Sequence, residues 1–264
     1  MPRFLAVLEY DGTDFHGSQL QAEGRSVQGE LERSLAALAG GKVDCILAGR
    51  TDSGVHAGGQ VVAFDLARAI GGIEVVRALN GLLPRDASVR EAAVAPPDFN
   101  PRYWARARRY RYTILDRPTR SALLDRFSYH VAEPLDAGAM RQAAGGLLGR
   151  HDFGAFGRPP QGDNTWRTIG RLDVGREGEL LTVIVEADAF LRRMVRLIVG
   201  VLIDAGRGKL RPDSVGDLLA GDGRPGSPAA PAKGLSLEAV AYERERLGCG
   251  TGLWWSCEPL STAV

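Results

Sequence analysis

The chain has 264 residues and a formal net charge of +1, and 44% of its residues are hydrophobic and 25% charged. This composition is ordinary for a globular protein with a hydrophobic core, and it excludes extended disorder. The near-neutral charge does not indicate a nucleic-acid partner, so evidence for one must come from local clusters of charge.

The first hundred residues predict alternating strands and helices. Strands are expected at 4–10, 43–47, 60–66 and 87–95, and helices at 27–38 and 73–79. Ser26 is the expected N-cap of the first helix, and Gly40 and Gly41 end it. The segment 49–56 carries two glycines and follows an apolar run, so we expect a loop there.

A second series of elements begins near Arg106. The polar residues Arg109, Arg111 and Thr113 alternate with Tyr110, Tyr112 and Ile114. This period of two predicts a strand. Further strands are expected at 127–131 and 235–242, and a hairpin at 168–174 and 180–187 around a turn at 175–178. Helices are expected after Asp136, as a short segment from Asp213, and at 190–205 as the longest of the chain; 221–231 reads as a loop.

These elements predict an α+β fold in two halves whose strand edges could join into one sheet. We place the halves at residues 1–105 and 106–248, followed by a tail at 249–264. The three cysteines include no Cys-x-x-Cys pair, and the longest apolar run, 197–203, is far short of the ~20 residues that cross a bilayer. The N-terminus shows no signal-peptide pattern. We therefore expect a soluble, cytoplasmic protein without membrane contact.

Arginine and aromatic residues alternate between residues 102 and 111. Five of these ten residues are arginines and none is acidic; the arginines are Arg102, Arg106, Arg108, Arg109 and Arg111. Cations that meet phosphates and rings that stack on unpaired bases suit RNA binding. The same pattern also fits a solvated strand face on which charges oppose aggregation, and the stretch alone does not decide between them.

Asp52 lies in the loop at 49–56 and has two readings. An aspartate before Ser-Gly commonly forms a turn, but a loop after a buried strand is also where scaffolds present catalytic groups. Three arginines, Arg192, Arg193 and Arg196, lie in an apolar segment, and Arg192 and Arg196 are one helical turn apart. Either all three face solvent or one of them pairs with a buried acid such as Asp52. The four histidines show no metal-ligand spacing, and no dinucleotide or phosphate-binding motif is present, so we expect no metal and no cofactor.

The segment 49–57 reads GRTDSGVHA, which closely resembles the active-site motif GRTDAGVHA of the TruA family of tRNA pseudouridine synthases. Further blocks resemble this family in the same order, at 9–12, 26–28, 80–86, 108–112, 152–153, 190–200 and 233–237. The resemblance covers roughly residues 4 to 243. One departure is Ser18, because the family usually has tryptophan between the glycine and the glutamine that stand here as Gly17 and Gln19.

The resemblance implies two RRM-like α/β halves around a shared antiparallel sheet, in a homodimer that binds tRNA. It implies isomerisation of uridine to pseudouridine at positions 38 to 40 of the anticodon stem-loop, without a cofactor. Asp52 matches the catalytic carboxylate, which either adds to C1′ of the ribose or removes the 2′ proton. The resemblance makes Arg196 the cation that pairs with it and Tyr110 the ring that stacks on the base. Leu235 matches a residue of the base pocket, and Arg50 matches an arginine near the flipped nucleotide.

Two other functions remain open at this point. A tRNA-binding chaperone without chemistry would explain the arginine stretch but would not need Asp52. A carboxylate-dependent hydrolase would need a second acid near Asp52, and Asp188 is a candidate for it.

Overall fold

The computed structural model describes residues 1–67, 70–160, 162–220 and 225–259. It is a mixed α/β fold with a mostly antiparallel sheet, as expected from the sequence. Two compact units divide the chain: unit 1 comprises Met1–Arg108 and Leu237–Val264, and unit 2 comprises Arg109–Ser236. No helix within the described ranges is long and apolar enough to cross a membrane.

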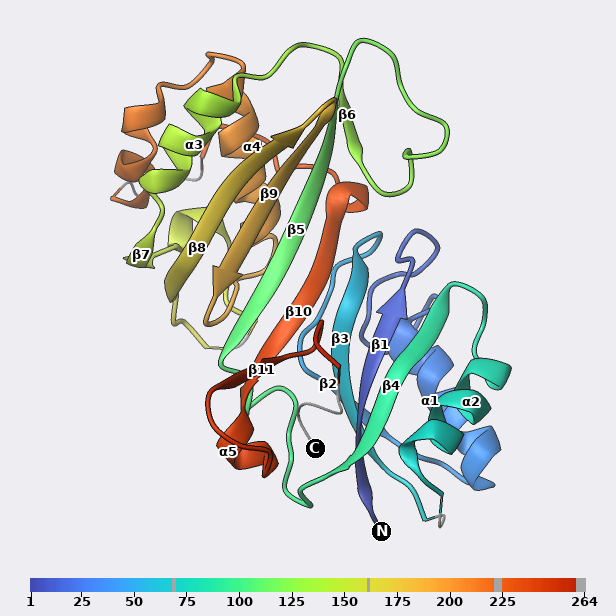
Figure 1. Ribbon diagram of the computed structural model, residues 1–264. Helices are drawn as coiled ribbons and strands as arrows, with labels where there is room; N and C mark the ends of the chain where they lie inside the picture. The colour runs from blue at the N-terminus through green and yellow to red at the C-terminus, as the bar shows by residue number, and fades with distance from the viewer. Residues whose placement is uncertain (68–69, 161, 221–224, 260–264) are drawn as a thin grey trace. The chain divides into compact units, whose positions relative to one another are not determined.

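Unit 1 is built on a sheet in which β3 has β1 and β10 as neighbours and β4 lies beyond β1 (Figure 1). β2 also pairs with β3, and β11 with β10. The strands are β1 (Arg3–Tyr10), β2 (Cys45–Leu47), β3 (His56–Asp65), β4 (Ala87–Ala95), β10 (Leu235–Glu243) and β11 (Leu253–Trp255). The helices are α1 (Val27–Ala39), α2 (Gly72–Leu82) and the short α5 (Arg244–Leu247).

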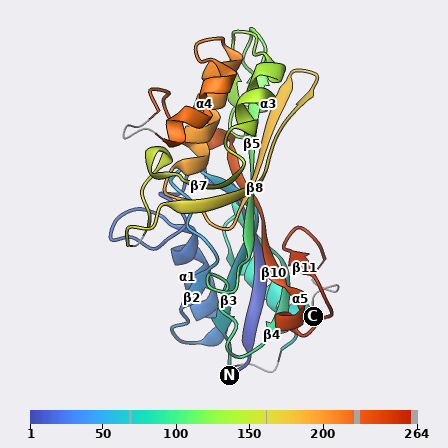
Figure 2. The same ribbon diagram turned by 90° about the vertical axis from the view of Figure 1, so that its left-hand side faces the viewer.

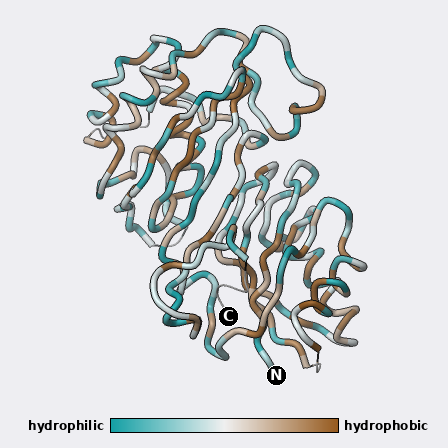
Figure 3. Tube along the Cα trace, viewed as in Figure 1, coloured by the Kyte–Doolittle hydropathy of each residue, from teal (hydrophilic) through white to brown (hydrophobic). Residues whose placement is uncertain are grey.

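The core of unit 1 centres on β1. All five residues from Phe4 to Leu8 are buried, and because successive side chains of a strand point to opposite faces, both faces of β1 are covered. Phe4 stacks on Phe64 of β3 at a ring distance of 5.8 Å. The hydropathy trace shows the same concentration of apolar residues along these strands (Figure 3).

Most elements predicted for this unit are confirmed, with shifted ends. Ser26 caps α1 by accepting the Gly29 N–H, and Gly40 ends that helix in the left-handed conformation. The strand predicted at 60–66 begins earlier, at His56, because Ala57 already pairs with Tyr10 of β1. The helix α2 continues past Asn80, since the Asn80 amide exchanges two hydrogen bonds, of 2.7 and 2.8 Å, with the backbone of Val89 in β4.

Unit 2 has its own run of strands in the order β5, β9, β8, β7, with β6 paired parallel to β5. They are β5 (Ala107–Asp116), β6 (Tyr129–Val131), β7 (Gly149–Asp152), β8 (Trp166–Glu177) and β9 (Leu180–Ala187). The helices α3 (Ala137–Gly145) and α4 (Met194–Gly206) pack on each other, and α3 packs on β8. Figure 2 shows both helices on the same side of β8. Short 3₁₀ turns lie at Gly154–Phe156, Pro212–Ser214, Gly216–Leu219 and Ala232–Gly234.

The helix predicted at 190–205 is wrong at its start. α4 begins at Met194 because Arg193 adopts the left-handed conformation, with φ of 64°, and the Arg192 N–H donates to the Arg158 carbonyl. Arg192 therefore precedes the helix and does not share a helical face with Arg196. α4 has 13 residues, as many as α1, so it is not longer than α1.

Three other elements predicted for unit 2 differ from the structure in their type or bounds. The hairpin turn is tighter than predicted, since β8 pairs as far as Glu177 and the turn is left to Gly178, with φ of 56°, and Glu179. The short helix expected from Asp213 is a pair of 3₁₀ turns. The strand expected at 127–131 is confirmed from Tyr129 onward. Of the loop expected at 221–231, residues 221–224 lie outside the described residues.

The C-terminal segment packs into unit 1. Trp254 is fully buried and stacks on Tyr242 of β10 at a ring distance of 6.0 Å. The Ser256 hydroxyl accepts the Val240 N–H at 2.9 Å and donates to the Gly59 carbonyl at 2.7 Å. These contacts attach the segment to both β10 and β3, so its described part is packed as part of unit 1.

Three of the six tyrosines, Tyr10, Tyr112 and Tyr242, are at most 2% exposed. Burial raises the pKa of each hydroxyl, that of Tyr10 to about 12 against an ordinary 10.0. The folded state thus holds these protons more tightly than the unfolded chain, so stability is full below about pH 10 and falls as the pH rises further. We expect these three to ionise only together with unfolding; ionisation of all six with the circular dichroism unchanged would contradict this.

Candidate active site

Asp52 begins a tight turn between β2 and β3. The Val55 N–H donates to the Asp52 carbonyl at 3.1 Å, and Gly54 at the third position has φ of 76°, as a type II turn requires. The Asp52 side chain is half-buried, and Ser53 beside it is exposed. The turn reading of this sequence is therefore confirmed, and it leaves a carboxylate at the surface of a rigid strand connection.

The backbone before Asp52 is held by the segment that follows β1. The Thr51 N–H donates to the Ser18 hydroxyl at 2.8 Å, and the Ser18 N–H donates back to the Thr51 carbonyl at 3.1 Å. The hydroxyls of Tyr10 and Thr51 share a hydrogen bond of 2.8 Å. Ser18, Thr51 and Tyr10 are all buried. Since water does not reach these groups, the contacts fix the path of the chain into Asp52.

The backbone after Asp52 is held by the same segment. The Ser53 hydroxyl and the Gly54 N–H both donate to the Phe15 carbonyl, at 3.2 and 3.4 Å. The Gly12 N–H lies 3.0 Å from Nδ1 of His56, and the same nitrogen lies 3.2 Å from Oδ1 of Asp11, so this buried histidine contacts the residues that follow β1. A Cβ atom at Gly12 would lie only 2.0 Å from the Val55 carbonyl oxygen, so only glycine permits this approach.

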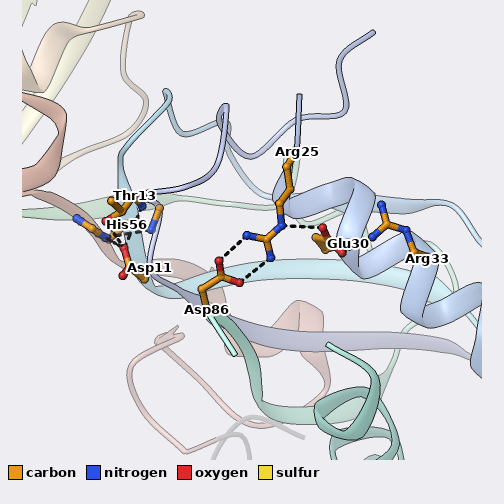
Figure 4. A network of polar contacts seen from close by, with 8 residues as sticks. Asp11, Thr13, Arg25, Glu30, Arg33, His56 and Asp86 are labelled. Atoms are coloured by element: carbon orange, nitrogen blue, oxygen red, sulfur yellow. Dashed lines mark hydrogen bonds and ion pairs between the residues drawn. The ribbon is translucent and has the colours of Figure 1, made fainter. Parts of the chain in front are cut away.

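An ion-pair network secures the segment that carries Phe15 (Figure 4). The guanidinium of Arg25 lies 4.3 Å from the centre of the Phe15 ring and binds both carboxylate oxygens of Asp86, at 2.5 and 2.7 Å. Its Nε donates to Glu30 of α1 at 2.7 Å, and Glu30 also binds Arg33. These acids raise the pKa of Arg25. The bidentate geometry ties α1, the residue before β4 and the Phe15 ring together.

Two side chains hold the strand end that leads into the loop. Arg108 donates through Nη2 to the carbonyls of Ala48 and Arg102, at 3.0 Å each, and Gln60 donates to the Gly49 carbonyl at 2.9 Å. Arg50, the next candidate residue along the chain, is exposed.

The other proposed active-site residues belong to unit 2. Tyr110 on β5 is 8% exposed and meets Phe190 edge to face at 5.1 Å. Arg196 lies in the first turn of α4, where its Nε donates to the Ala230 carbonyl at 2.6 Å and its own carbonyl accepts the Ala230 N–H. Leu235 is buried at the start of β10. The contacts of Tyr110 with Phe190 and of Arg196 with Ala230 thus lie within unit 2.

The arginine stretch is engaged largely with the protein itself. Arg106 pairs with Glu243 at 2.9 Å, Arg109 pairs with Glu186 at 2.7 Å, and Arg108 binds the carbonyls described above. Arg111 is exposed, and Arg102 lies 5.7 Å from the ring of Tyr103, which is 73% exposed. The solvated-strand interpretation thus fits Arg106, Arg108 and Arg109, while the half-buried Arg102 beside the exposed Tyr103 ring keeps the chemistry suited to RNA.

Asp188, the acid considered for a hydrolase, caps backbone groups. Its Oδ1 accepts the N–H groups of Thr168 and Ala189, at 3.0 and 2.7 Å. Across the described parts of the chain, no group of three or more His, Cys, Asp or Glu side chains could hold a metal ion.

Sequence reasoning missed the residues that support the Asp52 turn. Ser18 was noted only as a departure from the usual tryptophan, and its role as acceptor for Thr51 depends on a contact between segments far apart in the chain. The block 9–12 was the one local signal, since it contains Tyr10 and Gly12.

Comparisons with known proteins agree on one family. A family model described as tRNA pseudouridine synthase matches residues 6–104 and 143–243. The chain is 45% identical over 245 residues to tRNA pseudouridine synthase A of Myxococcus xanthus, covering 92% of each chain. It is 47% identical over 248 residues to the protein of that name from Acidiphilium cryptum, covering 92% of this chain and 97% of the relative. For the one from Geobacter sulfurreducens the identity is 44% over 238 residues, covering 89% and 98%.

Proposed function

The chain belongs to the tRNA pseudouridine synthase family, and we propose that it converts uridine to pseudouridine at positions 38, 39 and 40 of the tRNA anticodon stem-loop. It is an isomerase that acts on tRNA. The observation that carries the proposed role of Asp52 is its turn, whose backbone is anchored by a buried hydrogen bond before Asp52 and a part-buried one after it. A rigidly presented carboxylate meets the need of this reaction for an anionic group beside the ribose.

The reaction rearranges atoms within one nucleotide. The N1–C1′ bond breaks, the uracil turns, a C5–C1′ bond forms, C5 loses its proton and N1 gains one, so substrate and product have the same composition. An ionised Asp52 can support bond breaking by adding to C1′ or by taking the 2′ proton to give a glycal. Both routes return the carboxylate at the end, and neither needs a metal or an organic cofactor.

We assign the partner roles by residue. Arg196 is the cation that pairs with Asp52 and favours its charged form. Tyr110 stacks on the target base, Leu235 lines the base pocket, and Arg50 lies near the flipped nucleotide. The residue types support these roles, because stacking on an aromatic ring and contact with an aliphatic side chain can offset the cost of a few kcal/mol for taking a base out of its stack.

We assign RNA-backbone contacts to the arginines of the stretch at 102–111. The exposure of Arg111 and the exposed ring beside Arg102 support contacts from those two. To bind phosphates, Arg106 and Arg109 would have to leave their carboxylate partners. Arg108 would have to leave the backbone carbonyls that it binds. Phosphate contacts of this kind position the RNA without reading its sequence.

We also propose RRM-like halves, a homodimer and a cytoplasmic location. For unit 1 the element order β1, α1, β2, β3, α2, β4, with β3 and β4 flanking β1 and β2 beside β3, supports the RRM-like arrangement. Dimerisation and location follow from the family resemblance alone.

Tritium release tests the proposal. Transfer RNA labelled with tritium at C5 of uracil should lose tritium to water in the presence of the enzyme, since C5 must give up its hydrogen. A tRNA in which positions 38 to 40 are all cytidine is the matched control and should release none. Binding of tRNA without release would favour the chaperone function, and equal release from both RNAs would contradict the assignment to these positions.

A further inference from the structure

We propose that Ser18 is a positioning residue of this reaction, whose hydroxyl and backbone N–H hold Thr51 and thereby fix the chain that enters Asp52. The proposal rests on the proposed role of Asp52. Ser18 reaches Thr51 by two hydrogen bonds of opposite direction, at 2.8 and 3.1 Å, so the two segments are joined like neighbouring strands.

Close packing leaves the Thr51 N–H no alternative partner. Ser18 is 1% exposed and Thr51 is 6% exposed. At Gly17, with φ of 101°, a Cβ atom would lie 3.0 Å from the Thr51 carbonyl oxygen and 3.5 Å from the Ser53 nitrogen. The two segments are thus in close contact and shielded from solvent, and the hydroxyl of Ser18 is the acceptor that the buried N–H requires.

A second hydrogen bond also fixes the side chain of Thr51. The Tyr10 hydroxyl shares a hydrogen bond of 2.8 Å with the Thr51 hydroxyl, and both residues are buried. Gln60 donates to the Gly49 carbonyl. Ser18, Tyr10 and Gln60 thus form a buried polar layer along residues 49–51. Within it, Tyr10 binds the side chain of Thr51, and Ser18 holds the backbone of Thr51, directly before Asp52.

This arrangement is particular to a chain with serine at position 18. A tryptophan, which the resemblance described above implies at this position, offers an indole N–H donor and no acceptor. It could not receive the Thr51 N–H as the hydroxyl of Ser18 does. Here the position works through a hydrogen bond.

Ser18→Ala tests the proposal because it removes the acceptor and little volume. We expect the single-turnover rate of tritium release to fall about 10- to 100-fold, since displacing a catalytic group by about 1 Å has an effect of this size. The dissociation constant for tRNA should stay within about twofold, because Ser18 is buried. A loss confined to tRNA affinity, or a rate within about twofold of wild type, would overturn the proposal.

Ser256→Ala is the matched control. Ser256 is also buried in unit 1, and its hydroxyl likewise accepts a backbone N–H, from Val240 at 2.9 Å, but it does not contact the Asp52 loop. We expect a lower melting temperature and a rate within about twofold of wild type. If Ser256→Ala slowed the reaction as much as Ser18→Ala, the role of Ser18 would be structural only.

Tyr10→Phe covers the case in which Ser18→Ala does not fold. It removes one hydroxyl from the same layer and keeps the ring, and the same criteria for rate and affinity decide the outcome. Wild-type enzyme that releases no tritium would remove the proposed function and this inference together. An active wild type with an unimpaired Ser18→Ala or Tyr10→Phe would remove the inference alone.

Discussion

Replacement of Asp52 by asparagine should lower the rate of tritium release by about 10⁴-fold, the upper end of what one acid–base group contributes. Asparagine keeps the size of the side chain and the turn that Asp52 begins, which depends on backbone atoms. What it lacks is the negative charge that either route through C1′ or the 2′ proton requires. The dissociation constant for tRNA should change by less than about threefold, since phosphate contacts dominate RNA affinity.

A matched variant separates charge loss at this position from charge loss in general. Asp98→Asn removes an exposed carboxylate from the same unit and should leave the rate unchanged. Retention of more than about a tenth of the wild-type rate by Asp52→Asn would contradict a catalytic role, because general acid–base catalysis typically contributes about 100-fold or more. A loss of rate matched by unfolding, seen in circular dichroism, would assign Asp52 to the turn alone.

The elements that the sequence predicted well carry their signals locally. Ser26 and Asp136 accept N–H groups of the first turns of α1 and α3, as N-caps do, and Gly40 ends α1 with positive φ. β1 is an apolar run with a turn after it. Each of these depends on residues within a few positions of one another, so no knowledge of the tertiary fold is needed.

The start of α4 shows why other features could not be predicted. The apolar spacing continues through Phe190 and Leu191, so periodicity extends the helix backwards. The Arg192 N–H instead donates to Arg158, and Arg193 takes a left-handed conformation that is rare outside glycine. A contact between distant segments thus overrides the local pattern.

The candidate site likewise includes features that the sequence predicts and features that depend on the tertiary fold. The motif around Asp52 is contiguous and could be read directly, including its turn. The ion pairs of Arg106 and Arg109 could not be predicted, because their carboxylate partners Glu243 and Glu186 lie far along the chain. Ser18 is the clearest case: a serine in a loop has no distinctive pattern, and only the fold brings its hydroxyl to Thr51.

Substitution of Trp254 by alanine should lower the free energy of unfolding by about 3–5 kcal/mol, the usual cost of truncating a buried tryptophan. Trp254 is 0% exposed and stacks on Tyr242, which itself meets Phe99 edge to face at 5.5 Å. Removing the ring leaves a cavity beside this aromatic cluster. Urea unfolding followed by circular dichroism measures the change, and Leu253→Ala, at a neighbour that is 44% exposed, should cost less than about 1 kcal/mol.

Trp254→Phe separates the ring from its N–H group. The indole Nε1 is buried and has no hydrogen-bond partner in the described part of the chain, so phenylalanine removes an unsatisfied donor while keeping an aromatic surface on Tyr242. Its cost should therefore be well below that of alanine, and equal costs would show that stacking is not what stabilises the segment.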